Sequence, residues 1–346
     1  MSERVLFRCD VSPQIGTGHL RRCITLAREL KDYGAFICFA CRHESFEIDN
    51  ELRTIADEYV SLPWFITSES DAQEVVRLCN EYEISIVVID HYHAETEYQK
   101  QLYEAGIKWL QFDGGFQNPL WAKWVINSNL AAHKCNYSNI REKDETVFLC
   151  GPKYALLRRE FLDWRLKSIF SEQVQKILFT FGGGDDKGAT VFCLNATKSI
   201  APDIERVVLV SSANPGILHI TNWVKQNNHV EVKLEVDSDE IARHMCEADL
   251  AIISGGVTAF ETASMGLPNI IIQIAENQRR NADAWHEHGV SINVGRIETL
   301  NNRYIKQRVD TLIHNVEMRR TMSNAGMEMV DCSGAERVAK ILFSSN

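Results

Sequence analysis

Short apolar runs recur along the first half of the chain, and amphipathic stretches separate them. The apolar runs predict buried strands at 5–7, 36–40, 84–90, 108–112 and 124–127. Apolar residues at helical spacing predict helices at 20–30, 46–57, 72–82 and 95–105. Strands that alternate with helices of about 10–15 residues are typical of a parallel sheet covered by helices on both faces.

The same pattern starts again after a connecting region at 131–166. A strand is predicted at 176–181 and a helix at 189–200, and further strands at 206–210, 230–234, 250–253 and 269–274. The halves share a layout but no sequence repeat. We therefore predict an α/β protein with two Rossmann-like domains, at 1–166 and 167–346, whose last helix can pack back on the first domain. Parallel sheets bind ligands at the carboxyl ends of their strands, so two such domains facing across a cleft would hold one ligand.

Composition and charge restrict the class of protein. A chain of 346 residues exceeds what one hydrophobic core usually supports, which fits two domains. The net charge of −10 argues against nucleic acid or a membrane as the main partner. Because there is neither an apolar run of about 18 residues nor a signal-peptide pattern, we expect a cytoplasmic protein. Most of the ten cysteines lie in apolar patterns and are interpreted as small core residues.

The stretch 8–22 is the most informative part of the chain. The first apolar run ends there in a polar turn with Gly16 and Gly18, and the turn leads into the first helix at His19. Unpaired backbone N–H groups at a helix start favour anions. The third glycine of a dinucleotide fingerprint is missing, because Arg21 stands in its place. We interpret the stretch as an active-site loop; the alternative is a plain tight turn.

His19 is the candidate general base. A helix start disfavours the charged imidazolium, whereas a carboxylate such as Asp10 favours it. The balance leaves an imidazole that can take a proton near neutral pH. The alternative is a structural histidine whose hydrogen bonds are satisfied within the fold.

Two later glycine turns also follow strands and open helices. One is 182–188, which lacks the lysine of a P-loop; the other is Ser254, Gly255 and Gly256. Both suit a phosphate or a polar sugar. Glu261 follows in the helix after Gly256, and a carboxylate there can accept hydrogen bonds from ribose hydroxyls. The alternative for Glu261 is a solvated carboxylate.

The segment Asp90–His93 follows the clearest strand of the first half. Its two histidines could bind a metal together with His19 and Asp113. The other interpretation is a polar loop at the strand end, in which the Tyr92 hydroxyl contacts the substrate.

Motifs along nearly the whole chain resemble the PseG-type UDP-sugar hydrolases. The matching positions are Arg8, Asp10, Ser12, 14–16, Gly18, His19, 89–92, Phe112, Asp113, Asn127, Asn129, Gly151, 154–158, Glu160, Phe161, Gly183, Gly184, Asp186, Asn277 and Gln278. The family is similar to GT-B glycosyltransferases such as MurG, in which a nucleotide sugar lies between two domains. The resemblance implies catalytic roles for His19, Asp10 and Tyr92.

It further implies that Arg8, Gly16, Gly18, Gly183, Gly184, Ser254, Gly255, Gly256, Glu261, Asn277 and Gln278 bind the substrate. His19 would activate the water that releases UDP from a diacetamido-trideoxy sugar with inversion, on the route to pseudaminic acid. No metal or other cofactor is implied, and the expected partner is the UDP-sugar alone, bound to a monomer or weak homo-oligomer. A transferase with an acceptor hydroxyl and a non-catalytic nucleotide-sugar sensor remain alternatives.

Overall fold

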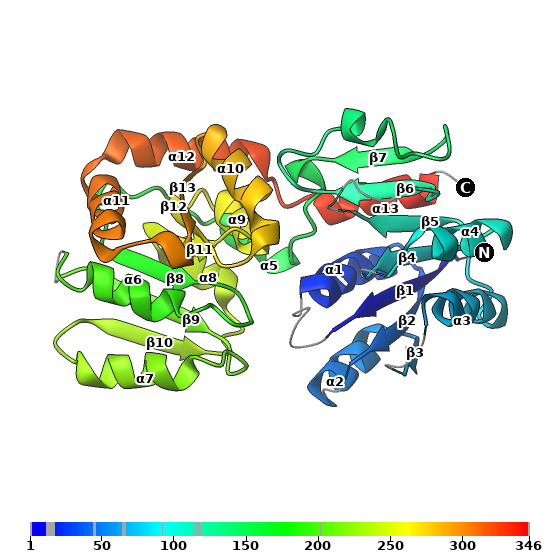
Figure 1. The fold of residues 1–346 in the computed structure, drawn as a ribbon, viewed down its shortest axis with the longest axis horizontal. Helices are drawn as coiled ribbons and strands as arrows, with labels where there is room; N and C mark the ends of the chain where they lie inside the picture. The colour runs from blue at the N-terminus through cyan, green and yellow to red at the C-terminus, as the bar shows by residue number, and fades with distance from the viewer. Residues whose placement is uncertain are drawn as a thin grey trace. The chain divides into compact units, whose positions relative to one another are not determined.

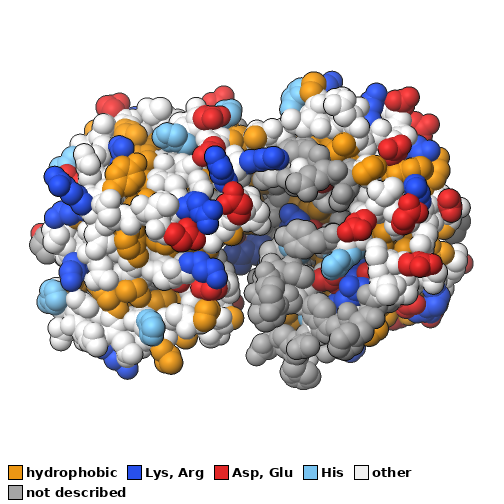
Figure 2. All heavy atoms as spheres, viewed as in Figure 1, with side chains coloured by type: hydrophobic (Ala, Val, Ile, Leu, Met, Phe, Trp, Pro, Cys, Tyr) orange, Lys and Arg blue, Asp and Glu red, His pale blue; other side chains and the backbone are white. Residues whose placement is uncertain are grey.

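The computed structural model describes residues 2–11, 18–43, 46–63, 67–91, 93–113, 115, 119–200 and 203–344. They form two compact units. Unit 1 comprises 1–157 and 333–346, and unit 2 comprises 158–332. In the described part of the chain, no helix is long and apolar enough to span a membrane. Acidic, basic and apolar side chains are interspersed on the visible face of each unit (Figure 2).

Unit 1 is a parallel sheet with helices on both faces (Figure 1). The strands are β1 (Arg4–Asp10), β2 (Phe36–Arg42), β3 (Glu58–Ser61), β4 (Ile86–Asp90), β5 (Trp109–Phe112), β6 (Trp124–Asn127) and β7 (Val147–Cys150). The helices are α1 (Gly18–Asp32), α2 (Phe46–Ile55), α3 (Ser68–Glu81), α4 (Thr96–Glu104) and α13 (Gly334–Ser344). The strand order is β3-β2-β1-β4-β5-β6-β7.

The side chains of β1 alternate between the two faces of this sheet. Val5, Phe7 and Cys9 join the apolar core that α1, α2 and α13 cover. Leu6 joins the opposite core, which α3 and α4 cover. Because alternate residues of a strand point to opposite faces, Arg8 and Asp10 belong to the same face as Leu6. This alternation determines which polar residues can meet at the end of the sheet.

Unit 2 repeats the arrangement. Its strands are β8 (Lys176–Thr180), β9 (Glu205–Val210), β10 (Val232–Val236), β11 (Leu250–Ser254), β12 (Asn269–Gln273) and β13 (Ser291–Arg296). Its helices are α5 (Arg159–Arg165), α6 (Ala189–Thr197), α7 (Ile217–Gln226), α8 (Ile241–Glu247), α9 (Val257–Ser264), α10 (Arg279–Glu287), α11 (Asn302–His314) and α12 (Val316–Met329). The parallel strand order is β10-β9-β8-β11-β12-β13. The fold class predicted from the sequence, two parallel-sheet α/β domains, is confirmed.

The division between the units differs from the boundary at 166/167. Helix α5 lies in unit 2, where the Arg165 guanidinium donates to the carbonyls of Ser264, Met327 and Val330. These carbonyls lie at the C-terminal ends of α9 and α12, so a partly buried arginine attaches α5 to the rest of unit 2. Helix α13 returns to unit 1, where its apolar side chains complete the core against α1.

Candidate active site

Each sheet has a topological switch point at its centre, where the strand order reverses. This point lies between β1 and β4 in unit 1 and between β8 and β11 in unit 2. The carboxyl ends of the central strands at such a point are where parallel sheets bind ligands. The residues predicted from the sequence lie near the ends of these four strands, in the segments that follow them or in the next helix. The exceptions are Asn277 and Gln278, which lie in the connection between β12 and α10.

In unit 1, the imidazole of His19 lies in contact with the carboxylate of Asp90. His19 lies in the first turn of α1, and its Nδ1 is 2.7 Å from Asp90 Oδ1, at the end of β4. The Asp90 side chain is buried, whereas the His19 side chain is 14% exposed. Arg22, one turn further along α1, donates through Nε and Nη2 to the two Asp90 oxygens at 2.5 Å each.

Asp90 remains ionised over the physiological range. Burial by itself would raise the pKa of the Asp90 carboxyl, but Arg22 and His19 outweigh it and hold this pKa below its ordinary value. A carboxylate on Nδ1 fixes the tautomer that carries its proton there and makes Nε2 the basic nitrogen. It also stabilises the imidazolium that forms when Nε2 takes a proton. The pair can therefore perform general base chemistry.

Asp10 is not the carboxylate beside His19. It lies on the other face of the sheet, where it accepts from Arg8 Nη1 at 2.5 Å and lies 3.6 Å from Arg42 Nη1. Asp71 of α3 accepts from Arg8 Nε at 2.9 Å and Nη2 at 2.7 Å, and also pairs with Arg42. The four side chains are almost completely buried. The carboxylate that contacts His19 in the described structure is thus Asp90, because β1 turns Asp10 toward α3 and not toward α1.

His91 also lies on the α3 and α4 side. Its Nδ1 accepts from the backbone N–H of His93 at 3.1 Å, and its Nε2 is 3.3 Å from the Tyr98 hydroxyl. Burial and the nearby Arg8 and Arg42 hold the pKa of His91 well below its ordinary value, so the ring is neutral. Asp113, the other proposed metal ligand, accepts from the Tyr137 hydroxyl. No group of three or more potential ligands that could hold a metal occurs among the described residues.

Three further predicted positions, Gly16, Gly18 and Tyr92, belong to the polar segments that follow β1 and β4. Gly16 and Tyr92 lie outside the described residues. Gly18 opens α1 directly before His19, and a side chain there would meet nothing within 4 Å. Gly18 is thus placed beside the base, but packing does not require a glycine at this position.

In unit 2, the turn after β11 is built around Gly255. Its N–H donates to Gln278 Oε1 at 3.4 Å, and its carbonyl accepts from Asn281 Nδ2 at 2.8 Å. A Cβ on Gly255 would lie 3.2 Å from Gln278 Cβ and 3.3 Å from Ala282 Cβ. The close approach of the α10 segment therefore requires glycine at this position. Asn277 is exposed in the short turn before α10.

The N-terminus of α9 begins directly after Gly256 and has no side-chain cap in the described structure. The first N–H groups of this helix carry a partial positive charge and suit a phosphate oxygen. Ser254 is buried at the end of β11, beside this turn. The arrangement fits the predicted diphosphate site at Ser254, Gly255 and Gly256.

The other glycine turn of unit 2 is different. Asp186 is buried, and its carboxylate accepts from the N–H groups of Gly188 at 2.9 Å and Thr190 at 3.1 Å. The chain's own carboxylate therefore occupies the start of α6. Gly183 and Gly184 precede this cap, so a phosphate bound there would lie close to a carboxylate and not at an open helix start.

Glu261 lies in α9 with its side chain 16% exposed, 3.9 Å from Arg158 Nη2. Burial raises the pKa of the Glu261 carboxyl, and the more distant Arg158 only partly offsets this. A half-buried carboxylate with one long ion pair has acceptor capacity for hydroxyl donors. This geometry is compatible with the predicted ribose contact.

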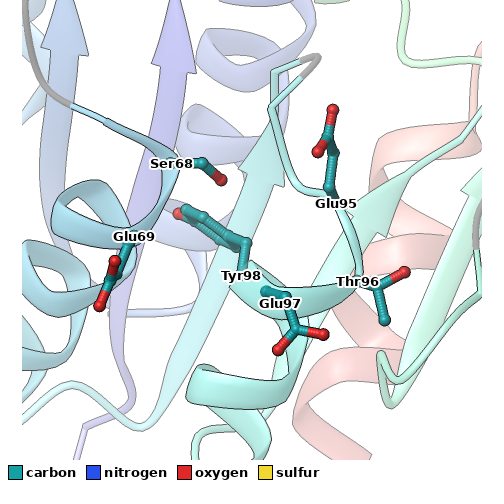
Figure 3. Close-up of a pocket in the computed structure, with 6 residues that line it drawn as sticks. All are labelled: Ser68, Glu69, Glu95, Thr96, Glu97 and Tyr98. Carbon is teal, nitrogen blue, oxygen red and sulfur yellow. The ribbon is translucent and has the colours of Figure 1, made fainter.

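A cavity of about 330 Å³ opens in unit 1 at the N-termini of α3 and α4 (Figure 3). It is lined by Ser68, Glu69, Glu95, Thr96, Glu97 and Tyr98. Three carboxylates make it unsuited to a diphosphate. The sequence predicts none of these six residues as part of the site.

Asp90 and Arg22 lie beside His19, whereas Arg42 and Asp71 belong to the buried cluster of Arg8 and Asp10. Sequence reasoning did not identify Asp90 as the carboxylate partner of His19, and it gave Arg42 and Asp71 no role. One signal was present for Asp90, an acid at the end of the strand that neighbours β1. Asp71 had no such signal, because it lies in the first turn of a helix where acids are common.

Comparisons with known proteins fit this geometry. No family model matches the chain. It is 28% identical over 294 residues to UDP-2,4-diacetamido-2,4,6-trideoxy-beta-L-altropyranose hydrolase of Campylobacter jejuni, covering 84% of this chain and 98% of that protein.

Two solved structures cover almost the whole chain. Acinetobacter baumannii MurG superposes with a TM-score of 0.72 at 15% identity, over 99% of both chains. UDP-GlcNAc 2-epimerase from Neisseria meningitidis, bound to UDP-GlcNAc, gives a TM-score of 0.68 at 12% identity, over 99% of this chain and 100% of that one. The chain therefore has the GT-B fold predicted from its sequence, and its resemblance to the UDP-sugar hydrolase extends along most of its length.

Proposed function

We propose that the protein is a hydrolase that splits a UDP-linked diacetamido-trideoxy sugar into UDP and the free sugar. The observation that carries this proposal is the His19–Asp90 contact, in which Nδ1 is 2.7 Å from the carboxylate. It supports a role for His19 as an oriented base at the carboxyl end of a parallel sheet. Similarity to the Campylobacter jejuni hydrolase supports the choice of reaction and of sugar.

In the proposed reaction, His19 Nε2 takes a proton from water as the water oxygen attacks the anomeric carbon. The bond between that carbon and the β-phosphate oxygen breaks, and its electron pair leaves with UDP. Attack opposite the leaving group inverts the configuration. Asp90 stabilises the imidazolium, and Arg22 holds Asp90 in place. The sequence resemblance adds Tyr92 as a substrate contact and pseudaminic acid synthesis as the route.

Unit 2 would hold the nucleotide. The N–H groups at the start of α9 would stabilise the charge that develops on the leaving diphosphate, so the step needs no metal. Glu261 would accept from the ribose hydroxyls. Gln278 is held by the backbone N–H groups of Ile274 and Gly255, so its amide lies beside the same turn.

The deciding experiment is an acceptor-free assay. The protein is incubated with the UDP-sugar, and UDP and free sugar are followed by NMR. Release without an acceptor supports the hydrolase, whereas release only with an added acceptor hydroxyl indicates a transferase. Binding of UDP without release under either condition indicates a nucleotide-sugar sensor.

His19→Ala tests the base. We expect the rate to fall by about 10²–10⁴-fold with UDP affinity largely kept. His219→Ala is the matched control, because His219 is an exposed histidine in α7. A His19→Ala variant that turns over at the rate of this control would remove His19 from the mechanism.

A further inference from the structure

Three buried thiols lie together directly behind the His19–Asp90 pair. Cys9 is in β1, Cys41 in β2 and Cys23 in α1, and each is fully buried. The sulfurs of Cys9 and Cys41 are 3.3 Å apart. Cys23 Sγ lies 3.7 Å from Asp90 Oδ2, so the cluster of three thiols contacts the carboxylate beside His19.

Cys9 and Cys41 occupy paired positions on neighbouring parallel strands. Paired residues of adjacent strands are about 4.7–4.9 Å apart, within the Cα separation of about 4.4–6.8 Å that a disulfide spans. Both side chains enter the core that α1 covers, so they point to the same face of the sheet. Closing the sulfur contact to bonding distance requires side-chain rotation more than strand movement.

The reactivity of Cys9 is unlike that of the other buried cysteines. Hydrogen bonds from Cys23 and Cys41 lower the pKa of the Cys9 thiol, although burial opposes this. Burial raises the pKa of both Cys38 and Cys79 to about 12. The thiolate is the nucleophilic form of cysteine, so among Cys9, Cys38 and Cys79 it is Cys9 that would react with an oxidant.

We propose that Cys9 and Cys41 form a reversible disulfide in the presence of a peroxide. The Cys9 thiolate attacks one peroxide oxygen, the O–O bond breaks, and hydroxide leaves to become water, which gives a Cys9 sulfenic acid. The Cys41 sulfur then attacks the Cys9 sulfur, the S–O bond breaks, and a second water leaves. Two thiols are oxidised by two electrons in total, and one peroxide is reduced.

The position of the pair connects oxidation to the active site. Cys9 precedes Asp10 and Cys41 precedes Arg42, the two residues whose charges meet at the ends of β1 and β2. Cys23 contacts Asp90, and Asp90 contacts His19 and Arg22, whose side chains are 14% and 31% exposed. A peroxide reaches the buried thiols only when the strand ends open locally.

The test uses hydrogen peroxide and intact-mass spectrometry of the full chain. We expect the mass of the intact treated chain to fall by about 2 Da. After denaturation, alkylation and digestion, we expect a pair of peptides joined by a disulfide between Cys9 and Cys41. Dithiothreitol should reverse both changes fully. Cys41→Ser removes the partner thiol. In this variant, the rate at which peroxide treatment consumes two thiols should fall at least about tenfold, and Cys9 should remain as a sulfenic acid or a higher oxide.

Cys79→Ser is the matched control, because Cys79 is a buried cysteine away from the cluster, and it should form the disulfide at the parental rate. If Cys9 and Cys41 stay reduced while the exposed Cys135 oxidises, the proposal is overturned. These readouts are masses, so they are independent of whether the protein hydrolyses a UDP-sugar. A shift of the His19 ring signals in ¹H–¹⁵N spectra on oxidation, absent in Cys41→Ser, tests the link to the active site; unchanged signals would refute that link.

Discussion

The central strand ends of the two units have the same topology but opposite chemistry. In unit 1 the ends of β1, β2 and β4 carry Arg8, Asp10, Arg42 and Asp90, all buried and paired. In unit 2 the end of β11 carries a serine followed by two glycines. Charged side chains thus occupy the strand ends in unit 1 (the unit 1 edge), whereas the end of β11 in unit 2 (the unit 2 edge) exposes backbone groups.

This difference between the strand ends matches the two tasks proposed for the two units. Buried ion pairs contribute little net stability, because desolvation offsets much of their attraction, but they fix geometry. A general base, the role proposed for His19, needs fixed geometry, which the contacts from Arg22 to Asp90 and from Asp90 to His19 provide. A diphosphate brings its own charge, so its site needs open N–H groups and close access to the backbone. Even within unit 2, α6 is closed by Asp186 while α9 is open.

The most severe test of the unit 1 edge is Asp90→Asn. We expect kcat to fall by about 10²–10⁴-fold, because an amide can leave His19 in the wrong tautomer and does not stabilise the imidazolium. UDP affinity should stay within about twofold, because the nucleotide site is assigned to unit 2. Initial rates and calorimetric titration with UDP measure the two quantities.

Asp32→Asn is the control for that variant, since Asp32 is exposed at the other end of α1. Equal losses of kcat and UDP affinity in Asp90→Asn would mean that the two edges do not have separate tasks. A fall in thermal stability that accounts for the lost rate would point to a structural role of Asp90.

The unit 2 edge is tested by Gly255→Ala. The added Cβ would approach Gln278 and Ala282 at 3.2 and 3.3 Å, so the turn must shift and UDP binding should weaken about tenfold. Gly184→Ala is the matched change in the other turn, where a Cβ meets nothing within 4 Å and the start of α6 is already capped. Its UDP affinity should be nearly unchanged. Equal weakening in both variants would show that the 182–188 turn also holds the nucleotide.

The smallest expected effect concerns the two carboxylates. Asp90 has a lowered pKa and stays charged on acidification, whereas Glu261 has a raised pKa and takes up a proton first, from above its ordinary value of 4.5. If ribose hydroxyls donate to the charged Glu261, UDP affinity falls as pH falls through that raised pKa. Between pH 7 and pH 5, parental affinity should fall about threefold more than that of Glu261→Gln.

The titration of UDP itself is common to both proteins and cancels in this comparison. Calorimetric titrations at the two pH values measure the difference. Parallel pH profiles for the parental protein and Glu261→Gln would exclude Glu261 from the nucleotide site.

Much of the fold is predictable because the apolar runs are distinct. The strands at 84–90 and 250–253 and the helix at 46–57 match β4, β11 and α2 closely. Strand β3 is not predicted, since Glu58–Ser61 is a short edge strand without an apolar run. Strand β7 lies in the supposed connecting region, because Val147–Cys150 is isolated by polar sequence on its N-terminal side.

The site was harder to predict than the fold. His19 could be proposed from the sequence because a histidine at a glycine-bearing helix start is a local pattern. Its carboxylate partner could not, because Asp10 is near in sequence while Asp90 is near in space. In a strand buried on both faces, the residues that point to either face are apolar. The hydrophobic pattern therefore does not reveal whether an acid at the strand end points to the same face as a given helix. Strand order and the position of α1 decide that question.

Helix α13 has a consequence for the order of folding during synthesis. Unit 2 is one continuous segment, 158–332, whereas unit 1 needs 333–346 to complete its core with Val338, Ala339 and Leu342. The ribosome therefore synthesises all of unit 2 before it synthesises α13, the helix that completes the core of unit 1. The sheet that carries His19 and Asp90 thus begins to form first, but its core is completed last, after the whole of unit 2 has been synthesised.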